Sequence, residues 1–220
     1  MCGRFTLSQS AEAIASVFQL NQVPTLEPRY NIAPTQPVPT VLETSARERQ
    51  FQLLRWGLIP TWAKDATMGS RLINARAETV AEKPAFRSAF RHRRCLVIAD
   101  GFYEWRRQDG KKQPFYFQMH DRQPFAFAGL WEHWQDPKGE AIDSCTILTT
   151  EANELLQQIH ERMPVILNPK DYDLWLDPTV QKSELQQLLQ PYSSTAMTSY
   201  PVSTKVNKPT NDTPELINSL

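Results

Sequence analysis

The sequence predicts a single mixed α+β domain, built around a curved, mostly antiparallel sheet or open barrel with short helices at its periphery. Its 220 residues fit one large domain, and neither an internal repeat nor a clear linker divides residues 1–220. The 17 prolines against 7 glycines predict many short elements, because proline disrupts long helices and central strands. Strand-like segments also follow one another without regular β–α–β alternation, which disfavours a doubly wound sheet.

The first 40 residues change from a helix to an irregular stretch. Ser8 or Ser10 can cap a short helix in which Ile14, Val17 and Phe18 share one face. Prolines then interrupt any regular element, and they stand at Pro24, Pro28, Pro34, Pro37 and Pro39.

Seven short segments rich in β-branched or aromatic residues predict the sheet. They span residues 38–42, 50–58, 95–99, 102–105, 114–119, 125–131 and 144–149. Helices are predicted at residues 75–81, 151–159 behind a Thr150 cap, 170–176 and 182–189. The polar tail, about residues 201–220, is expected to be loosely held, with candidate anchors at Val202, Val206, Leu216 and Ile217.

The composition is that of an ordinary globular protein, with 40% hydrophobic and 22% charged residues. No apolar run is long enough to span a bilayer, and the N-terminus lacks a basic segment followed by an apolar stretch. A cytoplasmic protein without membrane contact is therefore expected. The three cysteines, Cys2, Cys95 and Cys145, lack CxxC spacing, so neither disulfides nor a metal site is predicted, and no cofactor is expected.

Charge is distributed unevenly along the chain, although the formal net charge is zero. Residues 71–94 contain seven Arg and Lys residues against Glu78 and Glu82, a net charge of +5 that the remaining residues balance. Such a segment can bind nucleic acid. A solvated helical face is at least as good an interpretation of the cluster Arg87, Arg91, Arg93 and Arg94.

Cys2 is the residue with the most distinctive chemistry. Removal of Met1 would leave a cysteine with a free α-amine, whose pKa near ~7.7 leaves a useful fraction uncharged at neutral pH. This amine can attack an aldehyde, and the thiol of the same residue can then close the imine into a five-membered thiazolidine.

Three other interpretations of these features stay open. A cysteine at the second position is most often a small buried residue. A chain that starts with MCG can also be an N-terminal-nucleophile cysteine amidohydrolase or peptidase, in which the freed amine is the base for the thiol. The basic segment, with 10% aromatic residues, is also compatible with a non-covalent single-stranded DNA-binding module.

Six blocks in order along the chain carry a more specific signal. They are MCGRF at the N-terminus, YNIAPT at residues 30–35, RWGLIP at 55–60, NARAET at 74–79, DGFYEW at 100–105 and HERMP at 160–164. Together they resemble the SRAP family, the SOS response-associated peptidase proteins that process abasic sites, from residue 2 to about residue 217. The resemblance implies the SRAP fold and a thiazolidine cross-link between Cys2 and the ring-opened abasic sugar in single-stranded DNA.

The resemblance also implies the catalytic set Cys2, Asn74, Glu104 and His160. Glu104 lies in a strand-like apolar setting that would raise its pKa, so we expect it to exchange protons with the amine or the carbinolamine. His160 is expected to protonate the sugar oxygen or hold a phosphate. Asn74 is expected to hold the Cys2 amine or the sugar hydroxyl, and it can also cap the predicted helix at residues 75–81.

Five further residues are predicted to contact DNA. Arg4 and Arg76 suit phosphates beside the lesion, and Arg162 can join them. Trp62 can stack on a flanking base, and Asn31 is expected to line the site. The other tryptophans, among them Trp105, are assigned mainly to core packing.

The predicted partner is single-stranded DNA with abasic sites, which would associate the protein with the nucleoid. Replication-fork proteins are further candidate partners, and nothing in the sequence demands more than a monomer. The family's peptidase label is interpreted as exposure of the protein's own N-terminal cysteine, so proteolysis of other proteins is a weaker prediction.

Overall fold

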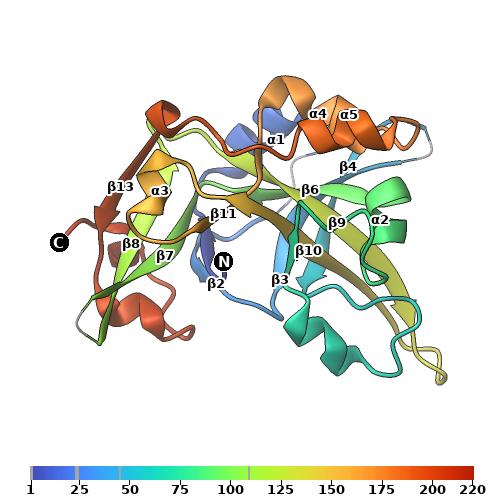
Figure 1. Cartoon of the computed structure of the whole chain (residues 1–220), viewed down its shortest axis with the longest axis horizontal. Coiled ribbons are helices and arrows are strands. Elements are labelled where there is room, and N and C mark those ends of the chain that lie inside the picture. Colours follow the sequence, from blue (N-terminus) through green and yellow to red (C-terminus); the bar gives the residue numbers. More distant parts are fainter. Residues whose placement is uncertain (1, 23–24, 45, 109) are drawn as a thin grey trace.

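The computed structural model describes residues 2–22, 25–44, 46–108 and 110–220, which form two β-sheets with short helices around them (Figure 1). The first sheet has five strands in the order β13-β8-β7-β1-β2, and all its pairings are antiparallel. Its strands are β1 (Phe5–Leu7), β2 (Arg29–Ile32), β7 (Gly101–Gln108), β8 (Lys111–Met119) and β13 (Met197–Pro201).

The second sheet has eight strands, in the order β11-β10-β4-β3-β6-β9-β12 with β5 beside β10. Because β10 pairs with both β4 and β9, the strands β10, β4, β3, β6 and β9 close into a ring. Only the pairings of β10 with β4 and with β5 are parallel among the described strands. The strands are β3 (Pro37–Glu43), β4 (Arg49–Trp56), β5 (Asn74–Arg76), β6 (Arg94–Ala99), β9 (Phe125–Gln135), β10 (Ala141–Glu151), β11 (Arg162–Pro164) and β12 (Ile166–Leu167).

Short helices lie at the periphery, and α1, α4 and α5 gather at the top of Figure 1. The α-helices are α1 (Ala11–Phe18), α2 (Arg87–His92), α3 (Glu154–Gln157), α4 (Tyr172–Leu176) and α5 (Lys182–Gln187). The 3-10 helices are η1 (Ala66–Arg71), η2 (Pro169–Asp171), η3 (Ser194–Ala196), η4 (Thr204–Asn207) and η5 (Pro214–Ile217). No helix in the described part of the chain is both long enough and apolar enough to cross a membrane.

The predicted mixed α+β fold with mostly antiparallel sheets is confirmed, and all seven predicted strands are present. The strand predicted at residues 50–58 ends earlier, at Trp56, because Gly57 has a φ of 128° and its N–H bonds to the Cys145 carbonyl. The six strands that the sequence did not predict, β1, β2, β5, β11, β12 and β13, have only two to five residues each.

The helix predictions hold in part. Ser10 caps α1 as expected, and its side chain accepts a hydrogen bond from the Ala13 N–H. The helix predicted at residues 75–81 is wrong, because this segment begins as β5 and continues in turns. The helix predicted behind Thr150 is shorter, since β10 continues to Glu151 and Asn153 caps α3 instead.

A single large apolar core joins the two sheets. Phe127 of β9 contacts Phe5 of β1 and Phe102 of β7, with ring centroids 5.8 and 5.9 Å away. Burial of such rings is the main stabilising term in a sheet protein of this size.

The C-terminal tail is well anchored, so the expectation that it is loosely held is wrong. Three of the four candidate anchors, Val202, Val206 and Leu216, are fully buried. They pack with Tyr103 and Tyr116 in a second apolar cluster. Ile217, the fourth candidate, is partly buried against the same cluster.

Candidate functional site

Cys2 enters the fold just before β1, the strand that lies between β2 and β7. The carboxylate of Asp100, from the turn before β7, accepts hydrogen bonds from the Thr6 and Ser8 hydroxyls and from the backbone N–H groups of Ser8 and Gln9. These four contacts hold the end of β1 against β7. They therefore restrict where Cys2 and Arg4 can lie.

The Cys2 side chain is fully buried, and its Sγ lies 3.9 Å from the Arg4 carbonyl oxygen. Burial raises the pKa of the Cys2 thiol well above its usual value, and the negative charge of Glu104 raises it further. The thiol is therefore protonated at neutral pH. Met1, whose removal the predicted chemistry requires, lies outside the described residues.

Asn74, on β5, holds the backbone of Cys2. Its Nδ2 donates a hydrogen bond of 2.7 Å to the Cys2 carbonyl oxygen, rather than capping a helix as one prediction had it. Its Oδ1 is buried and has no hydrogen-bond partner among the described residues. A buried acceptor without a partner is costly, so this oxygen is available for a group that the reaction brings.

Glu104, on β7, is only 3% exposed, and burial raises the pKa of its carboxyl group while the charge of His160 lowers it. His160 follows α3, and its Nδ1 accepts the backbone N–H of Arg162 at 3.0 Å. Both side chains line a cavity of about 570 Å³. The structure thus brings residues 2, 74, 104 and 160 close together.

The same cavity has walls that the sequence did not predict. Its full lining is Arg4, Glu104, Trp105, Arg107, Lys112, His160 and Asn207. Trp105 is half-buried rather than a core residue, and its Nε1 donates to Asn207 Oδ1 at 2.8 Å. In the sequence, the signal that could have assigned Trp105 to the site was its position next to Glu104 in the DGFYEW block. Asn207 carried no local signal, since it comes from the distant tail.

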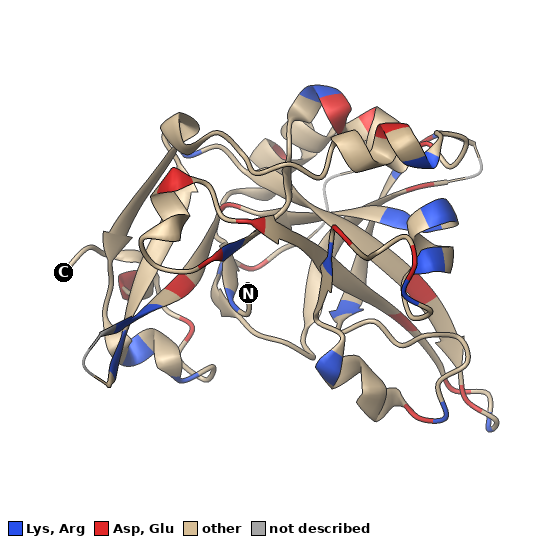
Figure 2. Ribbon diagram, in the orientation of Figure 1, with Lys and Arg blue, Asp and Glu red and all other residues tan. Residues whose placement is uncertain are grey.

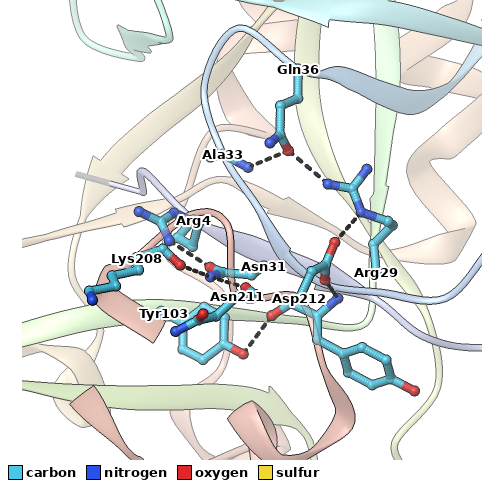
Figure 3. A network of polar contacts seen from close by, with 10 residues as sticks. Arg4, Arg29, Asn31, Ala33, Gln36, Tyr103, Lys208, Asn211 and Asp212 are labelled. Carbon is cyan, nitrogen blue, oxygen red and sulfur yellow. Dashed lines mark hydrogen bonds and ion pairs between the residues drawn. The ribbon is translucent and has the colours of Figure 1, made fainter. Parts of the chain in front are cut away.

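Arg4 is held by a polar network that reaches residues 206–211 near the C-terminus (Figure 3). Its Nη1 donates to Asn31 Oδ1 at 2.6 Å and to the Val206 carbonyl at 2.7 Å, and its guanidinium lies 6.0 Å from the Trp105 ring centre. Asn31 is fully buried, and its Nδ2 donates to the carbonyls of residues 206, 208 and 211. The structure therefore places Asn31 behind Arg4 rather than on the cavity wall.

The remaining predicted DNA contacts lie outside the lining of this cavity within the described part of the chain. Arg76 is exposed on β5, and Trp62 is 57% exposed. Arg162 forms a bidentate ion pair with Glu78, at 2.6 and 3.0 Å, and also donates to the Thr149 carbonyl. Arg162 is thus occupied by a carboxylate, whose shape and charge resemble those of a phosphate.

The basic segment at residues 71–94 is not one solvated face. Arg94 is only 3% exposed, and its guanidinium donates to the carbonyls of residues 90, 91, 175 and 177. Arg93 pairs with the buried Glu132. The helical-face interpretation is therefore wrong for Arg94, which fastens α4 and its following turn to β6.

Comparisons with known proteins agree on one family. The sequence model described as SOS response associated peptidase (SRAP) matches residues 1–209. The "Abasic site processing protein YoqW" of Bacillus subtilis (strain 168) is 47% identical, with 100% of both chains covered. The "Abasic site processing protein HMCES" of Xenopus tropicalis is 33% identical, over 86% of this chain and 65% of that protein. A crystal structure of a protein from Bacteroides thetaiotaomicron matches with a TM-score of 0.89 at 29% identity, covering 100% of both chains.

Proposed function

Since the chain belongs to the SOS response associated peptidase (SRAP) family, we propose that it captures abasic sites in single-stranded DNA as a covalent cross-link to Cys2. The observation that carries this proposal is the position of Cys2. Its carbonyl is held by Asn74, and it lies close enough to Glu104 for that charge to act on the thiol. An N-terminal aminothiol held beside an acid and a histidine suits an aldehyde substrate.

The order of the two nucleophiles follows from their protonation. The buried thiol has a raised pKa, whereas an α-amine freed by loss of Met1 has a pKa near ~7.7. The amine therefore attacks first. The raised pKa of the Cys2 thiol also disfavours the N-terminal amidohydrolase reaction, because that reaction starts with a thiolate.

The reaction balances without a cofactor. The amine nitrogen forms a bond to the aldehyde carbon of the ring-opened sugar, and the resulting carbinolamine loses its hydroxyl as water to give an imine. The Cys2 sulfur then bonds to the same carbon, and the thiol proton moves to the nitrogen. The product is a thiazolidine, in which the nitrogen and sulfur of Cys2 share one sugar carbon.

Glu104 and His160 manage the protons. A carboxyl group whose pKa is raised by burial is protonated for more of the time at neutral pH, so Glu104 can donate to the departing hydroxyl. His160, which lines the same cavity, protonates the sugar oxygen during ring opening. The buried Oδ1 of Asn74 accepts from the Cys2 amine and orients its lone pair.

Arg4 binds a phosphate beside the lesion in this proposal, and Asn31 positions Arg4. Their hydrogen bond and the Val206 carbonyl occupy Nη1, and Nε is buried, so Nη2 is the donor that this proposal assigns to the DNA backbone. Arg76, Arg162 and Trp62 are assigned to the flanking strand. Single strands are favoured because a flexible chain can turn its sugar into the cavity, whereas a duplex resists that bend.

A denaturing gel tests the proposal. The purified protein is mixed with a single-stranded oligonucleotide that carries one abasic site, and a slower-migrating covalent species is expected. Cys2→Ala should abolish this species, and so should acetylation of the N-terminus. Cys145→Ala is the matched control, because it removes another buried thiol far along the chain and should retain the adduct. An adduct on Cys2→Ala, or DNA mapped by mass spectrometry to another residue, would overturn the proposal.

A further inference from the structure

Two cations face each other across the β7–β8 hairpin. Arg107 of β7 and Lys112 of β8 are direct cross-strand partners, and both line the cavity that holds Glu104 and His160. Like charges in this position destabilise a sheet. Neither side chain forms an ion pair with an acidic residue in the ranges that the structure describes. Such an uncompensated pair of cations can bind an anion.

We propose that Arg107 and Lys112 together bind a backbone phosphate of the DNA strand, next to the abasic sugar. The inference rests on the proposed function and adds a phosphodiester subsite to it. Arg107 is three residues from Glu104 along β7, or about 10 Å at the rise of a strand. Because Arg107, Lys112 and Glu104 line the same cavity, a strand whose sugar lies at Glu104 can bring a neighbouring phosphate to the pair.

The C-terminal segment, defined as residues 204–212, contributes Asn207 to the cavity lining and carries a further cation, Lys208, next to it in sequence. The bond from Trp105 Nε1 to Asn207 Oδ1 ties the segment to β7 at the cavity wall. Asn31 holds the carbonyls of residues 206, 208 and 211 from behind. In Figure 3 the side chain of Lys208 extends to the same side of the network as the Arg4 guanidinium. Lys208 is exposed and can approach the same strand of DNA.

The positive charge near the β7–β8 hairpin favours binding of a polyanion. Figure 2 shows Lys and Arg concentrated toward the turn end of the β7–β8 hairpin. The whole chain has no net charge, so this concentration is local. A guanidinium and an ammonium group on neighbouring strands can contact two oxygens of one phosphate.

The experiment separates non-covalent binding from cross-linking. The probe is a single-stranded oligonucleotide with a tetrahydrofuran residue, an abasic analogue without an aldehyde, so Cys2 cannot bond to it. Fluorescence anisotropy measures Kd at several salt concentrations for the wild type, Arg107→Ala, Lys112→Ala and Lys208→Ala. Lys138→Ala is the matched control, because it removes one exposed cation from the β9–β10 turn, which lies far from the β7–β8 hairpin in Figure 1.

Each subsite variant should lower the slope of log Kd against log salt by about 0.7, the value for one phosphate contact on a single strand. Lys138→Ala should leave the slope unchanged. Arg107→Lys should have a slope close to that of the wild type, because it keeps the positive charge that Arg107→Ala removes. The position of the phosphate is found by replacing single linkages with neutral methylphosphonates. One linkage beside the analogue should weaken binding by the wild type but not by the Arg107→Ala variant.

Unchanged slopes in both Arg107→Ala and Lys112→Ala would overturn the subsite, as would equal sensitivity of wild type and variant to every neutral linkage. Inorganic phosphate is the competing ligand. Displacement of the probe by millimolar phosphate in the wild type, with no linkage effect, would assign the pair to a free anion and also overturn the inference. None of these measurements depends on Cys2, so a failed cross-linking test leaves them interpretable.

Discussion

The closed ring of strands and the five-stranded sheet are stabilised in different ways. In the ring, β6 is buried along its whole length, and its neighbours present mostly apolar side chains to the core. In the five-stranded sheet, buried polar groups bond to one another, as Asp100 does with Thr6 and as Tyr103 Oη does with the Tyr30 carbonyl. The ring therefore depends on apolar packing, whereas the sheet depends more on satisfied hydrogen bonds.

The difference explains where the candidate site lies. Cys2, Arg4 and Glu104 come from the sheet with the polar network, whereas Asn74 comes from β5 at the side of the ring. A charge without partners has a large desolvation cost in an apolar interior, and on the ring strands the buried Arg94 and Glu132 are fully committed to structural partners. A polar network can hold the charged groups of the site, because partners for each group are already in place.

Glu104→Gln should produce the largest effect in the polar sheet, on rate rather than on stability. The raised pKa of Glu104 means that its protonated, proton-donating form is lost only as pH rises through that raised value. The wild-type rate should therefore lose the Glu104 contribution as pH rises through that raised value, while the Cys2 amine becomes more reactive as it loses its proton. Single-turnover cross-linking should slow by about 10²-fold in Glu104→Gln, and its pH dependence should follow the amine alone. A pH–rate series checks this, and a variant that keeps the pH profile of the wild type would contradict the role.

Phe127→Ala should cause the largest loss of stability. The ring of Phe127 is fully buried where the two sheets meet, so its removal leaves a cavity and should cost about 3–5 kcal/mol of unfolding free energy. Urea denaturation followed by tryptophan fluorescence measures the change. Trp62→Ala is the control for removal of a large exposed ring, with an expected change within about 0.5 kcal/mol. Similar losses of unfolding free energy in both variants would contradict the expected difference between a buried and an exposed ring.

Asn31→Ala should lower both the stability of the protein and its binding to DNA. It removes the partner of Arg4 and three hydrogen bonds to the C-terminal segment, at a cost of about 1–3 kcal/mol. Because Arg4 loses its support, the salt dependence of binding to the tetrahydrofuran oligonucleotide should also weaken. Asn211→Ala, which removes one hydrogen bond to the Lys205 carbonyl, is the control. A loss of stability without any change in DNA binding would make Asn31 purely structural.

Glu78→Gln should have the smallest effect on stability. The Arg162 hydrogen bonds lower the pKa of Glu78, yet its side chain is 51% exposed, so the pair contributes only about 0–1 kcal/mol. The variant should bind single-stranded DNA more tightly, because Glu78 no longer competes with phosphate for Arg162. Glu82→Gln removes an equal charge without touching Arg162, and it serves as the control. Equal gains in both variants would indicate a general charge effect.

Much of the fold was predictable because its long strands carry local patterns. The seven predicted strands are the seven longest, and their β-branched and aromatic residues indicate extended structure wherever they pair. Strand β5 could not be predicted in this way. The segment that contains it, NARAETVA at residues 74–81, favours a helix locally, but parallel pairing of residues 74–76 with β10 outweighs that preference.

The sequence alone supplied the chemical hypothesis for the site. An aminothiol can arise only at Cys2, and the six blocks, through their resemblance to the family, supplied Asn74, Glu104 and His160. Only the tertiary structure decided which groups surround them. The bond between Trp105 and Asn207, the Asn31 support behind Arg4 and the Arg107–Lys112 pair each join positions whose partners local patterns do not specify. The physical reason is that residues far apart in sequence meet only through strand pairing and burial, which depend on the whole chain.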